Sequence, residues 1–143
     1  MPQEQFVAVK AIITHKDKIL LLRERAYDEA TNVGKWDVPG GRLGLGESPF
    51  DGIKREVAEE TGLHIRVDIP ISIDAWEPTI QGLKRHIVGM YIWCTTEEQQ
   101  VHLSDEHDEY RWVTIAEAGN LPLMSTVQRA LTAFDALQKR LLK

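Results

Sequence analysis

Residues 40–63 read GGRLGLGESPFDGIKREVAEETGL, and this stretch decides the fold. It joins a glycine-rich segment to a run with five acidic residues, three of them within REVAEE at positions 55–60. Ser48 is a good N-cap, Pro49 suits the first helical position, and Asp51 stands where a capping-box carboxylate would reach back. Gly62 supplies a helix stop. The sequence therefore predicts a helix over 49–61.

This predicted helix has a packing face and an acidic face. At helical spacing the packing face consists of Phe50, Ile53, the aliphatic part of Lys54, and Val57. The acidic face consists of Glu56, Glu59 and Glu60. Like charges at i, i+4 repel by about 0.2–0.5 kcal/mol per pair, and anions at the carboxyl end oppose the macrodipole. A divalent cation reverses that sign, and Mg²⁺ or Mn²⁺ fits best because the stretch holds no Cys or His for zinc. The alternative is an ordinary solvated face.

The stretch resembles a Nudix box. That pattern is a glycine, five residues, a glutamate, seven residues, Arg-Glu, an apolar residue, any residue, Glu-Glu, any residue, Gly and an apolar residue. All nine specified positions match within residues 41–63: Gly41, Glu47, Arg55, Glu56, Val57, Glu59, Glu60, Gly62 and Leu63. The resemblance implies an α/β (α+β) fold, a Nudix-like α/β/α sandwich with a mixed central sheet. It also implies hydrolysis of a diphosphate linkage in a nucleoside diphosphate joined to another group, with Mg²⁺ as cofactor and Mn²⁺ as a substitute.

The resemblance carries roles onto matching residues. Glu59 and Glu60 would be the main metal ligands, joined by the backbone carbonyl of Gly40, and Glu56 would ligate metal or take a proton from water. Arg55 would hold a carboxylate in place. The implied catalytic set is therefore Glu56, Arg55 and Glu59, while Glu47 would be a ligand or a brace for the helix. Substrate contacts are expected from Gly41, Arg42 and Glu47 in the glycine-rich loop, where glycines allow close backbone approach.

The family usually adds an acidic ligand from outside the box. In residues 104–112 (SDEHDEYRW) the candidates are Glu106 and Glu109, and Glu109 is preferred because it adjoins the strand predicted at 110–113. His102 and His107 share this region, but they form no HExxH pair, so neither is assigned to a metal.

The rest of the chain predicts strands and two further helices. Residues 6–14 and 19–22 suggest a hairpin, 23–35 a long surface loop, and 69–77 with 84–96 a second hairpin. Thr114 with Glu117 has the capping-box pattern for a brief helix, and Ser125 or Thr126 begins a final one. The apolar stripe of that final helix is Val127, Leu131, Phe134, Leu137 and Leu141.

Length and composition narrow the function class. A chain of 143 residues predicts one Nudix domain over 1–143. The net charge of −5 and the absence of a basic tract argue against duplex nucleic acid and against an RNA substrate, while a small-molecule nucleotide fits. The single cysteine, Cys94, and the lack of a signal-peptide pattern or a membrane-length apolar run favour a cytoplasmic protein with no membrane partner. A homodimer through an exposed sheet edge stays open.

The identity of the nucleotide rests on weaker signals. Tyr27 and Trp76 are candidates to stack on the base, as is Trp36, although large aromatics more often fill cores. Pro78 lies 15 residues past the box, similar to a proline of members that hydrolyse ADP-ribose. The compact chain is more similar to nucleoside triphosphate pyrophosphohydrolases, including those acting on oxidised nucleotides. Triphosphate is therefore preferred, with ADP-ribose or a nucleotide sugar second and a non-catalytic nucleotide sensor third, since a sensor would be expected to lose box carboxylates.

Overall fold

A computed structural model describes residues 3–25 and 34–142. In chain order its elements are β1 (Gln3–His15), β2 (Lys18–Glu24), β3 (Trp36–Asp37), β4 (Gly40–Arg42), α1 (Pro49–Thr61), β5 (Arg66–Trp76), β6 (Thr79–Ile80), β7 (Leu83–Thr95), β8 (His107–Val113), α2 (Ile115–Ala118) and α3 (Ser125–Leu141). Both predicted hairpins are confirmed, because β1 pairs antiparallel with β2 and β5 pairs antiparallel with β7.

The strands form one mixed sheet in the order β3-β2-β1-β7-β5. Its centre is the parallel pair of β1 and β7, which runs from Gln3 opposite Lys84 to Thr14 opposite Thr95. The short strand β4 joins the free edge of β1, with Gly40 opposite Lys10, and β8 pairs with β2. This topology brings the start of the box against the middle of β1.

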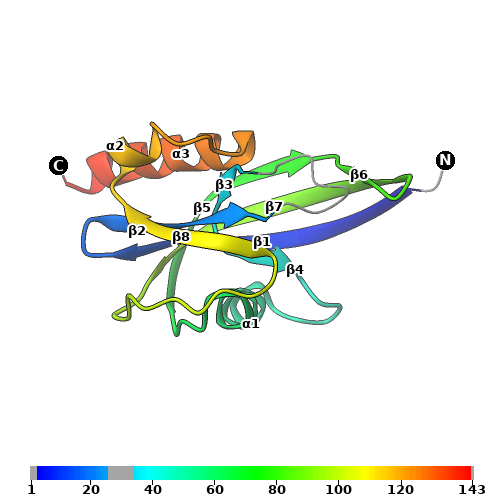
Figure 1. Cartoon of the computed structure of the whole chain (residues 1–143), viewed down its shortest axis with the longest axis horizontal. Helices are drawn as coiled ribbons and strands as arrows, with labels where there is room; N and C mark the ends of the chain where they lie inside the picture. The colour runs from blue at the N-terminus through cyan, green and yellow to red at the C-terminus, as the bar shows by residue number, and fades with distance from the viewer. Residues whose placement is uncertain (1–2, 26–33, 143) are drawn as a thin grey trace.

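Helices cover both faces of the sheet, as Figure 1 shows with α1 below it and α2 and α3 above. A hydrophobic core lies on each face of the sheet, and strand β1 contributes side chains to both. Val9, Ala11 and Ile13 pack with α1, while Ile12 packs with α3. Alternate side chains of a strand point to opposite faces, so a strand buried on both reads as the nearly continuous apolar run seen in the sequence. The predicted α+β sandwich is confirmed.

Helix α1 begins and ends as predicted, but its buried face differs. The Ser48 hydroxyl accepts from the Asp51 amide at 3.1 Å, and Gly62 closes the helix at φ 75° with its amide on the Ala58 carbonyl. Within the described residues only the Ser48 half of the predicted capping box is present.

The prediction that Phe50 and Lys54 line the packed face of α1 is wrong, since both are exposed. Ile53 and Val57 are buried as predicted, and Glu60 is buried with them. The burial of Glu60 takes one of the three glutamates off the exposed face and into the protein.

The carboxyl-terminal helices follow the sequence closely. Thr114 and Glu117 form the predicted capping box of α2. Helix α3 begins at Ser125 and buries Val127, Leu131 and Phe134, while Leu141 at its end is exposed. In the described part of the chain, no helix is long and apolar enough to cross a membrane.

Candidate active site

The glycines at the start of the box make room for backbone and carboxylate. Gly40 has φ 147°, and a Cβ there would overlap the backbone of Val9 on the neighbouring strand. At Gly41 an added Cβ would lie 2.6 Å from the Oε2 of Glu56. Gly40 therefore excludes a larger side chain, whereas at Gly41 an added Cβ would have to displace the Glu56 carboxylate.

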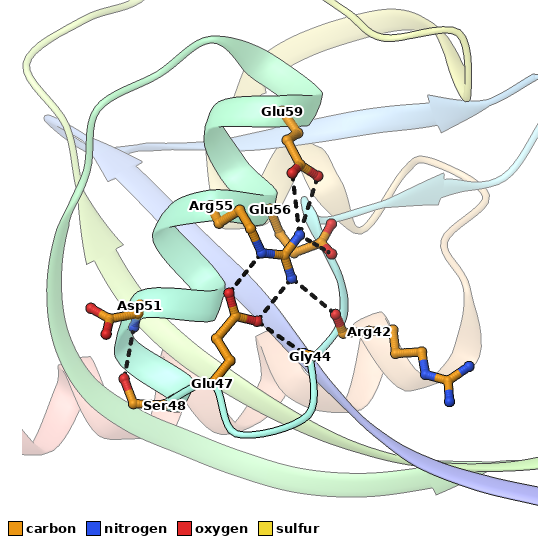
Figure 2. A network of polar contacts seen from close by, with 8 residues as sticks. All are labelled: Arg42, Gly44, Glu47, Ser48, Asp51, Arg55, Glu56 and Glu59. Carbon is orange, nitrogen blue, oxygen red and sulfur yellow. Dashed lines mark hydrogen bonds and ion pairs between the residues drawn. The ribbon is translucent and has the colours of Figure 1, made fainter.

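Arg55 is the centre of the ionic network drawn in Figure 2. Its guanidinium donates to both carboxylate oxygens of Glu47, at 2.7 and 2.9 Å. It also donates to Glu56 at 3.1 Å and to Glu59 at 3.2 Å. The planar fork of arginine suits this bidentate geometry, which lysine cannot reproduce. One cation thus arranges three of the four box glutamates.

Glu47 is held from two sides. The Arg55 hydrogen bond is the main cause that lowers the pKa of Glu47 to about 2, and the Gly44 amide, which donates to Glu47 at 2.9 Å, adds to it. Its contacts with Arg55 tie the loop to α1, and its contact with Gly44 closes the loop on itself. The geometry favours the bracing role among the two that the sequence left open.

The remaining box glutamates differ in exposure. Burial raises the pKa of Glu56, whose side chain is 14% exposed, against the opposing effect of Arg55. The Glu59 side chain is 58% exposed. Glu60 is only 6% exposed, and it accepts a hydrogen bond from the Gly40 amide at 2.7 Å. Burial raises its pKa to about 8, although Lys10 and the Gly40 amide act in the opposite direction.

A buried ion pair that the sequence analysis missed lies beside Glu60. The Lys10 ammonium contacts Asp37 Oδ2 at 2.9 Å, and both residues are less than 10% exposed. Burial lowers the pKa of Lys10, but the charges of Asp37, Tyr91 and Glu60 outweigh it and raise that pKa. The available signal was a single lysine inside the apolar run FVAVKAIIT.

Of the two acidic candidates from outside the box, Glu106 is the one that lies beside Glu60. The loop before β8 crosses the end of α1, with the His102 amide on the Thr61 carbonyl at 2.9 Å and the Ser104 amide on the Glu60 carbonyl at 3.2 Å. Donor atoms of Glu60, Glu106 and His107 consequently lie within 4.8 Å of one another.

Glu109, the residue preferred from the sequence, lies outside this group of three. Its carboxylate pairs with Arg23 at 3.0 Å and with Arg111 at 3.1 Å. The difference arises because the loop meets α1 before β8 begins, and β8 begins at His107, earlier than the predicted strand at 110–113.

The residues predicted to contact substrate are dispersed. The Arg42 side chain lies over Phe6 at 4.4 Å and pairs with Glu4, and in Figure 2 it points away from Arg55. Trp36 is buried in the core beside α3. Trp76 is half-buried, and Gly89 leaves room for its indole, since a Cβ there would lie 2.5 Å from the ring. Tyr27 lies outside the described residues.

Comparisons with known proteins agree with this arrangement. The NUDIX domain family matches residues 4–134. A MutT-like protein of Streptomyces ambofaciens is 31% identical over 94% of this chain and 80% of its own length. The CTP pyrophosphohydrolase of Escherichia coli K12 is 28% identical over 91% of each chain. The crystal structure of a MutT protein from Methanosarcina mazei superposes with a TM-score of 0.82 and 30% identity, covering 97% of this chain and 99% of the other.

The match spans both hairpins and all three helices except the last residues of α3, so it does not rest on the box alone. The chain belongs to the Nudix family, and it is a hydrolase that acts on pyrophosphate bonds.

Proposed function

We propose that the chain hydrolyses a nucleoside triphosphate, ordinary or oxidised, to the nucleoside monophosphate and pyrophosphate in a Mg²⁺-dependent reaction. The observation that carries this proposal is the buried carboxylate of Glu60 beside Glu106, on a helix whose other glutamates are gathered by Arg55. The E. coli relatives named as CTP pyrophosphohydrolase and nucleoside triphosphatase support a triphosphate over other nucleotide derivatives.

A divalent cation suits the chemistry of this donor set. Glu56, Glu59, Glu60 and Glu106 offer oxygen ligands, which Mg²⁺ and Mn²⁺ prefer, and the Gly40 carbonyl is a further candidate. Burial that raises the pKa of Glu60 means that the ionised form needs added positive charge. When bound, such an ion would neutralise phosphate charge and lower the pKa of a water molecule.

The protein's own groups would position the reactants. Glu56 is our candidate for the group that accepts the proton from water, because burial brings its pKa up toward the working pH. The water oxygen then bonds to phosphorus as the bridging oxygen leaves with the other phosphate product. Arg55 would hold Glu56 in line during this step, and Glu47 would keep Arg55 in place.

The test is formation of nucleoside monophosphate, with its pyrophosphate or sugar phosphate co-product identified, across a panel of triphosphates, oxidised triphosphates, ADP-ribose and nucleotide sugars, with Mg²⁺ or with EDTA. Glu59→Gln is the informative variant because its side chain is largely exposed, so its loss should leave the fold intact. We expect kcat to fall on the order of 10²-fold or more.

Asp51→Asn on the same helix is the matched control, since Asp51 is exposed and lies outside the Arg55 network. Its turnover should equal that of the native chain. A best substrate without a triphosphate would reject the proposed substrate class, and nucleotide binding without cleavage would reject catalysis in favour of a sensor.

A further inference from the structure

His107 has a ring nitrogen that is buried without a partner. The residue is 4% exposed, and no described residue provides a hydrogen bond to its Nδ1. Buried polar atoms in folded proteins are nearly always paired, so an orphan of this kind calls for a missing partner. A ring nitrogen of His107 lies within 4.8 Å of the Glu60 and Glu106 carboxylates.

An irregularity in the sheet places this imidazole. Strands β2 and β8 pair as Arg23 with Glu109 and then Glu24 with His107, so that Asp108 is the extra residue of a β-bulge. Bulges redirect side chains. Here the Asp108 carboxylate turns out to Arg23 at 2.8 Å, while His107 is buried.

Glu24 lies opposite His107 on the neighbouring strand β2. Its Oε1 is 3.8 Å from His107 Nε2. A proton held on Nε2 and directed at this carboxylate leaves Nδ1 with a free lone pair, the form in which imidazole binds metals. A carboxylate behind a histidine is also the usual outer support of a metal-bound imidazole.

We propose that Glu60, Glu106 and His107 form a metal position with one nitrogen donor. The sequence offers His107 no HExxH partner; in the structure the neighbouring carboxylates come from α1 and from the preceding residue. Two ligands of one ion, each about 2.0–2.3 Å from it, lie up to about 4.6 Å apart, so the observed spacing needs little adjustment. The inference deepens the proposed function, on which its place in the reaction rests.

A nitrogen donor predicts a metal preference. Mg²⁺ favours oxygen-only sites, whereas imidazole suits first-row transition metals. The position should therefore bind Mn²⁺ more tightly than Mg²⁺. Replacing His107 should reduce the difference in affinity between the two ions. Glu24→Gln keeps the ring and alters only its support, so it should weaken Mn²⁺ binding while the nitrogen ligand stays.

The experiment is a Mn²⁺ titration of the full chain by electron paramagnetic resonance, followed by pulsed measurement of nuclear coupling to the bound ion. We expect a ¹⁴N coupling that becomes a ¹⁵N coupling after histidine labelling. His107→Gln should remove it and weaken Mn²⁺ affinity by about tenfold or more. The exposed His102 is the control, because His102→Gln should change neither quantity.

The native labelled chain decides the question even if His107→Gln fails to fold, because His107 is the only histidine that the described residues place beside the carboxylates. Bound Mn²⁺ without nitrogen coupling, or no Mn²⁺ binding, overturns the proposal. Mg²⁺-dependent hydrolysis measured in parallel separates the two hypotheses: turnover without nitrogen coupling rejects only the histidine ligand, and coupling without turnover rejects only the proposed reaction.

Discussion

The buried pair of Lys10 and Asp37 offers a quantitative test of how the site is supported. Replacing Lys10 with methionine keeps most of the side-chain volume but leaves Asp37 without its cation, in a position that is only 5% exposed. Asp37 keeps one hydrogen bond, from the Val38 amide to Oδ1 at 2.7 Å. That bond satisfies one carboxylate oxygen and leaves the one that faced Lys10 uncompensated.

Removing one partner of a buried ion pair costs about 3–5 kcal/mol, whereas replacing both partners by neutral groups is often nearly neutral. Lys10→Met should therefore lower the free energy of unfolding by about 3–5 kcal/mol and Tm by about 10–20 °C. Adding Asp37→Asn retains an acceptor for the Val38 amide and removes the unpaired charge. The double variant should recover most of the loss.

The assay is urea unfolding at pH 7 with EDTA, so that metal binding adds nothing to stability. Lys18→Met, at an exposed position that begins β2, is the matched control and should stay within about 0.5 kcal/mol of the native chain. A Lys10→Met cost below about 1 kcal/mol would refute the reasoning. So would a double variant as unstable as the single one.

Two further predictions concern the carboxylates. Gly41→Ala should lower kcat on the order of 10²-fold, because the added Cβ must displace the Glu56 carboxylate, and it should cause little loss of stability. Gly119→Ala lies outside the site and should leave kcat unchanged in the same assay. Burial raises the pKa of Glu60 from its usual 4.5 to about 8, so between these values the folded chain holds a proton that the unfolded chain has released. In thermal melts with EDTA, the native chain should therefore lose stability relative to Glu60→Gln as pH rises from about 4.5 to 8, and parallel curves for the two proteins would contradict this assignment.

Sequence patterns that involve residues a few positions apart correctly predicted many of the helices and strands. The box spacing, the Ser48 cap and the Gly62 stop locate α1 because capping depends on residues a few positions apart. The hairpins follow from β-rich runs separated by turn residues. The pairing of Thr114 with Glu117 is equally local, and the structure contains it.

The parts of the site that sequence reasoning missed depend on contacts between distant segments. Helical spacing places Glu60 beside Glu59, but its burial depends on contacts with distant segments, such as the hydrogen bond from the Gly40 amide in β4. The choice between Glu106 and Glu109 depends on where a loop crosses α1, which spacing within that loop does not encode. The bulge that buries His107 depends on the register of β8 against β2.

The parallel pairing of β1 and β7 also bears on how the chain is made. Its partners lie about 80 residues apart, as the contact of Gln5 with His86 shows, and such long-range pairings slow folding. During synthesis the apolar β1 leaves the ribosome well before β7 has been made. The edge of β1 that pairs with β7 therefore has no hydrogen-bonding partner during that interval. A nascent chain stalled before residue 83 should bind chaperones and should not yet have a formed active site.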